Sequence, residues 1–315
     1  MITLLDVQEA RKNIQNITKV TPIFTSEQLD IVCGNKMFLK AEYLQKTGSF
    51  KIRGATNKVK QAVREGARFI TAASSGNHGQ AVAYIANQLG VPARIVVPED
   101  ASFCKIDAIK AYNGEIEKCG TMSAERIPRA IELAKEKDGL FIPPYDDPFI
   151  MAGQGTVGLE VLEQVADVDV VVVPVGGGGL ISGVLTAVKE SNPAVRVVGV
   201  EPESANDTYL SLQENRVVSI PLTATIADGL RTSQPGDLTF PVLQKYLDDL
   251  VLVSENEIRA ALRFVFERMK QVVEPSSAVT VAAAMTGKLG VSGKKVVCVM
   301  SGGNVDIERL PNLLD

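Results

Sequence analysis

The sequence predicts an α/β protein built on open, twisted, mostly parallel sheets that are covered by helices. Short runs of β-branched residues alternate with segments of helical period along the whole chain, as in α/β proteins. The run DVVVVPV at 169–175 is apolar on both faces, which is typical of a parallel strand with helices on each side. Polar or glycine-rich loops follow several of these runs, where doubly wound proteins bind their ligands.

Each element has its own local evidence. The strand predictions cover 69–74, 93–99, 115–119, 169–175, 196–202, 249–255 and 295–301. The segment 80–89 predicts a helix, because Ala81, Ile85 and Leu89 share one helical face. The run SENE places Ser254 and Glu257 as a capping box, so a helix is expected over the following IRAALRFVFERM.

The run LFIPPYDDP at 140–148 predicts a crossing between domains, because its prolines and aspartates favour an irregular connection. We therefore predict a large domain formed by 1–62 and 148–315, and a small mobile domain formed by 67–146. The active site is expected between them.

Composition excludes several classes of protein. A chain of 315 residues with 45% hydrophobic residues can form well-packed domains and is too apolar to be disordered. A formal charge of -4 gives no electrostatic footprint for nucleic acid. No long apolar run occurs, and acids stand near the start where a signal peptide needs an apolar core. We predict a cytoplasmic protein with no membrane or nucleic-acid partner.

Cysteine and histidine usage narrows the chemistry further. Cys33, Cys104, Cys119 and Cys298 form no C-x-x-C pair, which favours reduced, mostly buried thiols. His78 is the single histidine, so multi-histidine metal sites are excluded and a hydrolase triad has only one candidate.

The first loop of chemical interest is 47–55, TGSFKIRGA. Lys51 stands at the start of a helical pattern, next to Phe50. A helix N-terminus and an aromatic wall both disfavour the ammonium form, and a neutral amine is what an imine-forming lysine needs. A surface lysine at a helix start is the alternative, and on this peptide alone it is the more common case.

Three further loops follow strands. The loop 74–80, SSGNHGQ, predicts a site for a carboxylate or a planar ring at a helix N-terminus, or simply a solvated turn with an asparagine cap. The run Gly176–Gly179 directly after a buried strand predicts backbone N–H groups converging on a phosphate, although a tight turn is the alternative. The loop 301–304, SGGN, is by itself better explained as a plain turn.

One ligand with a phosphate, a planar ring and an aldehyde would use all of these loops, and pyridoxal 5′-phosphate has the three features. The motifs S-F-K-x-R-G, S-S-G-N-H-G, G-G-G-G-L and S-G-G-N, in this order, resemble the fold-type II pyridoxal-phosphate enzymes, specifically the threonine/serine dehydratases and serine racemases. The resemblance covers essentially the whole chain, from TPIFTSEQL near its start to the SGGN loop.

The resemblance implies roles for the cofactor-binding residues. Lys51 is expected to be the Schiff-base lysine and the base that removes the Cα proton. Phe50 would pack on the ring, Asn77 would hydrogen-bond the phenolic oxygen, and Gly176–Gly179 would hold the phosphate. Ser301 would face the pyridine nitrogen, and a neutral partner there suits elimination more than transamination.

It also implies a substrate site. The substrate carboxylate is expected on the loop formed by Ser74, Ser75, Gly76, Asn77 and His78, with His78 shaping the loop rather than acting as a base. Arg126 matches an arginine of the small domain that can help bind this carboxylate in serine racemases. Ser75 is the hydroxyl that serine racemases use as acid or base on the face opposite the lysine.

A cation site follows from the same resemblance. Glu201, the Ala205 carbonyl and Asp207 have the spacing of a divalent-cation site in serine racemases, and all-oxygen ligands suit Mg²⁺ or Ca²⁺. Solvated loop residues are the alternative. Asp228 and Glu274 are expected to orient the site without touching substrate.

These features favour a threonine/serine dehydratase of the racemase-like branch, which eliminates water from L-threonine or L-serine to give a 2-oxo acid and ammonia. The alternatives are a serine racemase, a threo-3-hydroxyaspartate dehydratase, or a non-catalytic amino-acid sensor, against which Lys51 counts. Family members are usually homodimers. The chain ends at Asp315, so a regulatory C-terminal domain and isoleucine feedback are not expected.

Overall fold

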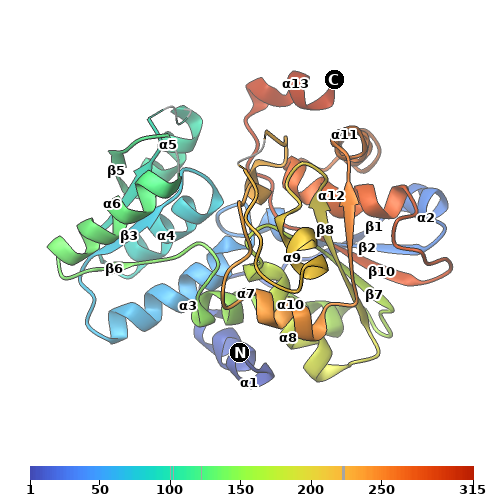
Figure 1. Cartoon of the computed structure of the whole chain (residues 1–315), viewed down its shortest axis with the longest axis horizontal. Helices are drawn as coiled ribbons and strands as arrows, with labels where there is room; N and C mark the ends of the chain where they lie inside the picture. The colour runs from blue at the N-terminus through green and yellow to red at the C-terminus, as the bar shows by residue number, and fades with distance from the viewer. Residues whose placement is uncertain (100, 102, 122, 222–223) are drawn as a thin grey trace.

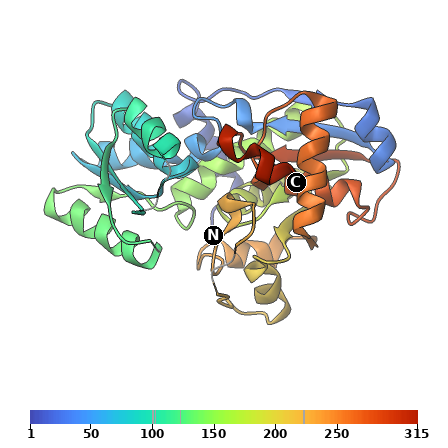
Figure 2. The same ribbon diagram turned by 90° about the horizontal axis from the view of Figure 1, so that it is seen from above.

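The computed structural model describes residues 1–99, 101, 103–121, 123–221 and 224–315. The side chains of residues 103, 104, 123 and 124 lie outside this description, so the prediction for Cys104 lies outside it as well. The described strands form two sheets, which Figure 1 shows side by side with helices around each. The two groups of strands are also separate when seen from above (Figure 2).

The larger sheet has the strand order β1-β2-β10-β7-β8-β9. Its members are β1 (Ile23–Thr25), β2 (Lys36–Ala41), β10 (Lys295–Met300), β7 (Val170–Pro174), β8 (Arg196–Pro202) and β9 (Asp249–Val253). Only the edge pair β1 and β2 is antiparallel among these described strands. The carboxyl ends of the parallel strands therefore lie at one edge of the sheet, where α/β proteins bind ligands.

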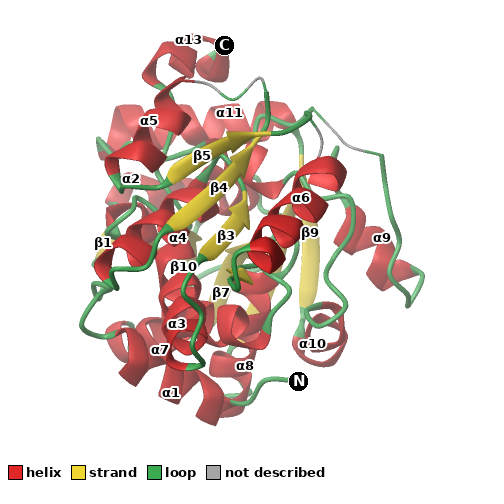
Figure 3. Ribbon diagram, turned by 90° about the vertical axis from the view of Figure 1, so that its left-hand side faces the viewer, coloured by secondary structure: helices red, strands yellow, loops and turns green. Residues whose placement is uncertain are grey.

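The smaller sheet is entirely parallel, with the order β5-β4-β3-β6. It contains β3 (Ile70–Ala73), β4 (Ala93–Val97), β5 (Glu115–Lys118) and β6 (Leu140–Phe141), and Figure 3 shows the first three nearest the viewer. Two mostly parallel sheets confirm the predicted fold class. The domain boundaries at 62/67 and 146/148 stay a prediction.

Helices cover both sheets. In chain order they are α1 (Leu4–Ile14), α2 (Glu27–Cys33), η1 (Glu42–Leu44), α3 (Lys51–Arg64), α4 (Asn77–Gln88), α5 (Phe103–Ala111), α6 (Ser123–Glu136), α7 (Pro148–Gln164), α8 (Gly179–Ser191), α9 (Asp207–Gln213), η2 (Asp228–Leu230), α10 (Phe240–Tyr246), α11 (Glu255–Phe264), η3 (Val265–Met269), α12 (Pro275–Met285), η4 (Ile307–Arg309) and α13 (Leu310–Leu314). Helix α7 packs against α1, α3 and α8. It thus joins the helix that begins with Lys51 to the layer that covers the larger sheet.

The predicted strands are all present, and their ends differ from the prediction by at most two residues. The predicted capping box is also confirmed, because the Ser254 hydroxyl accepts from the backbone N–H of Glu257 and the Glu257 carboxylate accepts from that of Ser254. The helix expected over 80–89 begins earlier, at Asn77, since the polar loop itself forms its first turn. Three short strands, β1, β2 and β6, were not predicted.

Strand β2 was missed because its sequence, KMFLKA, carries charge on a buried face. Lys40 in this strand is fully buried, and its ammonium donates to Glu160 on α7 at 2.5 Å. Arg53 donates to the same carboxylate at 2.6 Å and to Glu42 at 2.7 Å. These four side chains tie β2, η1, α3 and α7 together directly behind Lys51.

The described cysteines Cys33, Cys119 and Cys298 form no disulfide with one another, and only Cys298 is buried, so the prediction of mostly buried thiols is wrong for the described cysteines. Burial raises the pKa of Cys33 to about 11, so this thiol is mostly protonated at neutral pH. In the part of the chain that the structure describes, no helix is long and apolar enough to span a bilayer.

Candidate active site

Two of the predicted loops meet at the carboxyl edge of the larger sheet. The backbone N–H of Phe50 donates to the carbonyl oxygen of Ser301 at 3.0 Å, and that of Gly303 donates to Gly48 at 2.9 Å. The side chain of Asn304 donates to the carbonyl oxygen of Thr47 at 2.8 Å. Strand β2 leads into the first loop and β10 into the second, so the adjacency of these strands brings the loops together.

Lys51 is the first residue of α3, and its amine lies between both parts of the molecule. Nζ donates to the carbonyl oxygen of Pro144 at 2.7 Å and lies 5.3 Å from the centroid of the Phe50 ring. Burial lowers the pKa of the Lys51 amine to about 8, and the negative charge of Glu274 opposes this effect. Near neutral pH a larger fraction of Lys51 is therefore neutral than in a surface lysine, as a nucleophilic amine requires.

Asn77 brings the loop of the smaller sheet into the same site. Its side-chain nitrogen donates to both carboxylate oxygens of Glu274, at 2.9 and 3.0 Å. Its side-chain oxygen accepts from Asn304 at 2.7 Å. Burial raises the pKa of Glu274 to about 7. The Asn77 amide is thus held in one orientation, as expected for a residue that must present a donor to a ring oxygen.

His78 is buried, and its Nε2 lies 2.9 Å from the carbonyl oxygen of Ile142, so Nε2 carries a hydrogen and donates it. Burial, followed by the charge of Lys51, lowers the pKa of His78 to about 3. A neutral imidazole that donates to the backbone favours the predicted role of shaping the loop, and it argues against a general base.

The rest of this loop is more open. Ser74 and Ser75 are half-buried, and the backbone N–H of Gly76 donates to the Ser74 hydroxyl at 3.2 Å. The Ser75 hydroxyl makes no hydrogen bond to any residue that the structure describes. A Cβ atom on Gly76 would meet nothing within 4 Å, so the backbone here borders open space. Arg126 lies on α6, which packs on the smaller sheet. Its side chain donates to the carbonyl oxygen of Thr121 at 2.8 Å.

The glycine loop follows β7 and begins α8. Gly178 has a φ of 91°, a left-handed conformation that glycine adopts without strain. A Cβ atom on Gly177 would lie 2.4 Å from the Tyr145 ring, so the close approach of this ring also requires glycine. Thr239 donates to the carbonyl oxygen of Gly177 at 2.8 Å and holds the loop from its other side.

The segment 142–145 connects these parts, and its role was not predicted. The carbonyl oxygen of Ile142 accepts from His78, that of Pro144 accepts from Lys51, and the Tyr145 ring lies against the glycine loop. The prolines and aspartates of 140–148 predicted only a crossing between domains. The sequence signal that could have shown this role is the predicted crossing itself, because a segment that runs from one sheet to the other passes the site that lies between them.

The donor groups fit pyridoxal phosphate. In the described part of the chain, the backbone N–H groups of Gly176–Gly179 donate to no other residue, which leaves them for an anion at the start of α8. The buried hydroxyls of Thr47 and Ser49 likewise lack a partner there. The Ser301 hydroxyl is buried 3.2 Å from that of Ser277, and because Ser277 donates to the carbonyl oxygen of Gly302, Ser301 is the donor in the serine pair. Ser301 is a neutral group, so it carries no negative charge that would stabilise a protonated ring nitrogen.

The predicted cation ligands lie at the carboxyl end of β8 and just beyond it, since Glu201 belongs to β8 and Asp207 begins α9. Glu201 and Asp207 are fully buried, and burial raises the pKa of both carboxyl groups. Glu201 accepts from the backbone N–H groups of Thr208 and Tyr209 at 3.1 and 2.9 Å. Within the described residues, no group of three or more histidine, cysteine or acidic side chains forms a metal site.

Fold and site together are those of an α/β protein in which a buried lysine and a glycine loop lie at the carboxyl edge of the larger sheet. Comparison with known proteins agrees, since residues 14–302 match the model of the pyridoxal-phosphate dependent enzymes. The chain belongs to this family, which confirms the predicted cofactor.

Individual relatives cover nearly all of the chain. An L-threonine ammonia-lyase of Thermotoga maritima is 44% identical over 100% of this chain and 79% of its own length. A serine racemase of Dictyostelium discoideum is 40% identical over 100% of this chain and 98% of its own. The solved structure of maize serine racemase superposes with a TM-score of 0.95 at 37% identity, covering 99% of this chain and 96% of the maize chain.

Proposed function

We propose that this protein is a threonine/serine dehydratase that eliminates water from L-threonine or L-serine and gives a 2-oxo acid and ammonia, with serine racemisation as a second reaction. The observation that carries the proposal is the Lys51 amine, which has a lowered pKa and lies where the predicted loops converge. Relatives named as threonine ammonia-lyases and serine racemases support it.

When bound, pyridoxal phosphate supplies an aldehyde for an amine and a ring that withdraws electrons from the Cα atom of an amino acid. The N–H groups of Gly176–Gly179 would hold its phosphate, and Phe50 would pack on its ring. Asn77 donates to the ring oxygen while Glu274 and Asn304 fix the amide's orientation. Ser301 offers the ring nitrogen a neutral hydroxyl, which leaves that nitrogen without a full positive charge.

The reaction then needs groups that hold protons. The neutral Lys51 amine takes the Cα proton, the C–O bond at Cβ breaks as a Cα=Cβ double bond forms, and the departing hydroxide takes a proton from the Lys51 ammonium and leaves as water. The released enamine becomes an imine, and addition of water to this imine gives the 2-oxo acid and ammonia. The substrate carboxylate binds to the loop formed by Ser74, Ser75, Gly76, Asn77 and His78. Arg126 supplies an additional cationic group for this carboxylate. This assignment rests on the open backbone at Gly76 and on the helix N-terminus that begins at Asn77.

Ser75 supports the second reaction. Its hydroxyl makes no hydrogen bond to a described residue, so it is free to hold or deliver a proton. A proton returned by Ser75 to the face of Cα opposite Lys51 would invert the configuration of serine. Water is lost instead whenever the Cβ hydroxyl leaves before this proton arrives.

A substrate panel tests the proposal and separates its alternatives. Purified holoenzyme is given L-threonine, L-serine or threo-3-hydroxyaspartate, and 2-oxobutyrate, pyruvate, oxaloacetate and D-serine are measured. Fastest release of 2-oxobutyrate or pyruvate is expected. Mainly D-serine would identify a racemase, and mainly oxaloacetate would identify a hydroxyaspartate lyase, an activity named for a yeast relative 40% identical to this chain. No product from a protein that binds amino acids would favour a sensor.

Further proposals concern a bound cation, the motion of the small domain, the assembly and the location. Glu201, the Ala205 carbonyl and Asp207 would bind Mg²⁺ or Ca²⁺, since these two buried carboxylates form no ion pair with a described lysine or arginine and such carboxylates favour a cation. The segment 67–146 would move as a small domain over the substrate.

A second copy of the chain would cover the apolar face of α2, where Ile31 is 81% and Val32 49% exposed. The cytoplasm is the proposed location.

A further inference from the structure

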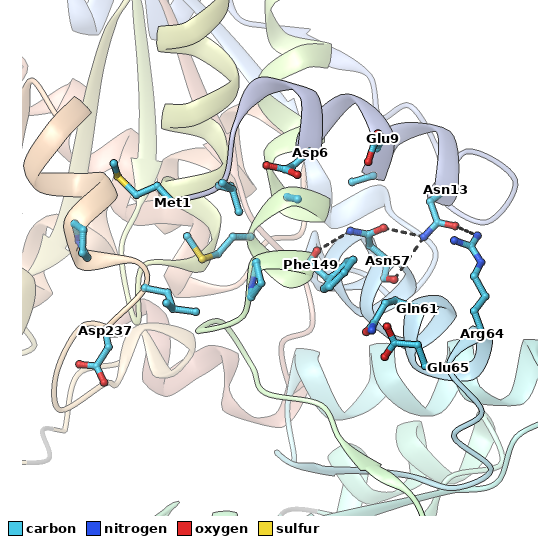
Figure 4. Close-up of a pocket in the computed structure, with 17 residues that line it drawn as sticks. Met1, Asp6, Glu9, Asn13, Asn57, Gln61, Arg64, Glu65, Phe149 and Asp237 are labelled. Atoms are coloured by element: carbon cyan, nitrogen blue, oxygen red, sulfur yellow. Dashed lines mark hydrogen bonds between the residues drawn. The ribbon is translucent and has the colours of Figure 1, made fainter.

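A cavity lies between α1, α3, the start of α7 and the loop before α10, and Lys51 is not among the residues that line it. Its volume is about 570 Å³. Ile2, Ala10, Met151 and Ala152 form a buried apolar floor. Apolar side chains also reach its mouth, where Phe149 is 40% exposed (Figure 4). This volume and this lining are those of a small-molecule site, which typically measures about 300–1,000 Å³.

One wall of the cavity is polar, and its groups are occupied by one another. Asn57 donates to the carbonyl oxygen of Phe149 at 2.8 Å, and Asn13 donates to the side-chain oxygen of Asn57 at 2.8 Å. The guanidinium of Arg64 donates in turn to Asn13. Figure 4 shows this series of contacts along the wall. Arg64 is the only arginine or lysine that lines the described cavity, and it is exposed; its hydrogen bond to the neutral Asn13 orients the guanidinium but leaves its positive charge in place.

Negative charge surrounds the cavity instead. Asp6 and Glu9 lie on α1, Glu65 lies just after α3, and Asp237 lies on the loop before α10 (Figure 4). None of these four carboxylates forms an ion pair within the described residues. Gln61, also in the lining, has a buried side-chain oxygen without a hydrogen-bond partner there. The walls thus offer acceptors and negative charge around an apolar floor.

We propose that this cavity is a binding site for a small organic cation with a compact apolar body and an ammonium head. The apolar body would lie on the floor formed by Ile2, Ala10, Met151 and Ala152, and the positive head would lie among the carboxylates. An anion of the same shape is disfavoured, because the four carboxylates around the cavity outnumber Arg64, the single lysine or arginine of the described lining.

The cavity also borders two segments that contact the proposed cofactor site. Phe149 follows directly on the connection that carries Pro144 and Tyr145. Leu238 belongs to a loop whose backbone N–H groups donate to Asp146, and the next residue, Thr239, donates to Gly177. An occupant that presses on Phe149 and Leu238 therefore acts on the supports of Lys51 and the glycine loop, and we expect occupancy to change turnover.

Fluorescence can test the site, because the chain contains no tryptophan. Leu238→Trp places a single reporter at the mouth, where Leu238 is 47% exposed. The probe is benzyltrimethylammonium, whose quaternary nitrogen cannot react with the cofactor aldehyde. We expect a saturable change in the emission of the Leu238→Trp holoenzyme, and calorimetric titration of the parent holoenzyme should give a binding isotherm. Neither benzyl alcohol nor benzoate should match its affinity.

Charge variants test the recognition. Glu9→Gln/Glu65→Gln should weaken binding of the probe about fivefold, since two nearby charges are removed in a solvated site. Glu27→Gln/Glu308→Gln, which removes two exposed carboxylates that do not line the cavity, should leave the affinity unchanged. Equal binding of benzoate, or equal losses in both double variants, would overturn the ammonium assignment. Failure of the probe to bind the parent by calorimetry would overturn the site.

Two outcomes separate this proposal from others. If a second copy of the chain covers the mouth, Leu238→Glu will lower the mass of the protein in solution, and the cavity proposal is then wrong; we expect an unchanged mass. Saturating probe should change kcat or KM of the parent, and about five times more probe should be needed for half of this effect in Glu9→Gln/Glu65→Gln. An unchanged kcat and KM with bound probe would refute the effect on turnover. The binding measurements do not depend on the proposed reaction.

Discussion

The side-chain nitrogen of Asn77 donates to both carboxylate oxygens of Glu274, at 2.9 and 3.0 Å, although the two residues are 197 positions apart in the chain. Asn77 begins α4 beside the smaller sheet, and Glu274 precedes α12 on the larger one. This contact therefore connects the two halves of the molecule at the point where the cofactor ring is proposed to bind. It also leads to a prediction about pH.

Glu274→Gln should remove a pH dependence from the stability of the cofactor-free protein. Burial raises the pKa of Glu274 to about 7, above the value of about 4.3 in an unfolded chain. The folded state therefore binds the proton more tightly, so the stability from this group is complete below the unfolded pKa and is lost as pH rises through 7. Glutamine does not ionise, so its melting temperature relative to the parent should rise between about pH 5 and pH 8. A constant difference would contradict this, and Glu27→Gln is the exposed control.

Lys51→Ala should abolish turnover and the yellow absorbance of the bound cofactor while the fold remains. The proposed phosphate site on Gly176–Gly179 is separate from the Lys51 amine, so the variant can still bind the cofactor non-covalently. Absorbance, circular dichroism and a dehydratase assay measure the three properties. Lys36→Ala is the control, because the Lys36 side chain is 74% exposed. Activity near the parent level in Lys51→Ala would refute the assignment.

Ser75→Ala should separate the two reactions. We expect D-serine formation from L-serine to fall about 100-fold or more, the usual range for a positioned proton donor. Dehydration of L-serine or L-threonine should fall much less, since it needs only Lys51 and departure of the hydroxyl. Elimination from D-serine should fall with racemisation, because Ser75 would be the base for that enantiomer.

Chiral chromatography of serine and a coupled 2-oxo acid assay measure these rates in the same reaction. Ser75→Thr retains a hydroxyl and should recover part of the racemisation, which a purely structural role would not require. Equal losses in all three rates would show that the two faces of Cα are not served by different residues.

Removal of divalent cations should lower the melting temperature of the parent protein if Glu201 and Asp207 bind one. The ion would offset the repulsion between two buried carboxylates and would bind only the folded state. Glu201→Gln and Asp207→Asn should weaken this response to added Mg²⁺ or Ca²⁺. A parent protein whose melting curve is the same with chelator and with either ion would have no structural cation at this position.

Arg53→Met should destabilise the protein by about 3–5 kcal/mol, because it leaves Glu42 and part of Glu160 buried without their partner. Arg11→Met removes the exposed ion pair with Glu163 and should cost only about 0–1 kcal/mol. Denaturant unfolding of both variants measures the difference. Similar losses would mean that the buried network adds little beyond a surface pair.

Local sequence determined the elements whose pattern is short in range. Valine-rich runs such as 169–175 predicted their strands, because apolar side chains on both faces can only be buried between helices. The run Gly176–Gly179 predicted its turn, and glycine is required there because Gly178 has a left-handed backbone and a Cβ atom on Gly177 would meet Tyr145. Ser254 and Glu257 predicted a helix start from two residues alone.

Only the tertiary structure decided what depends on distant partners. Strand β2 is formed despite its lysines because Lys40 finds Glu160, 120 positions away, and a buried ammonium is stable only with such a partner. The segment carrying Pro144 and Tyr145 became part of the site because it crosses between the sheets beside Lys51 and Gly177. Hydrogen bonds and buried charges act over a few ångströms in space, so residue order alone cannot show which of them meet.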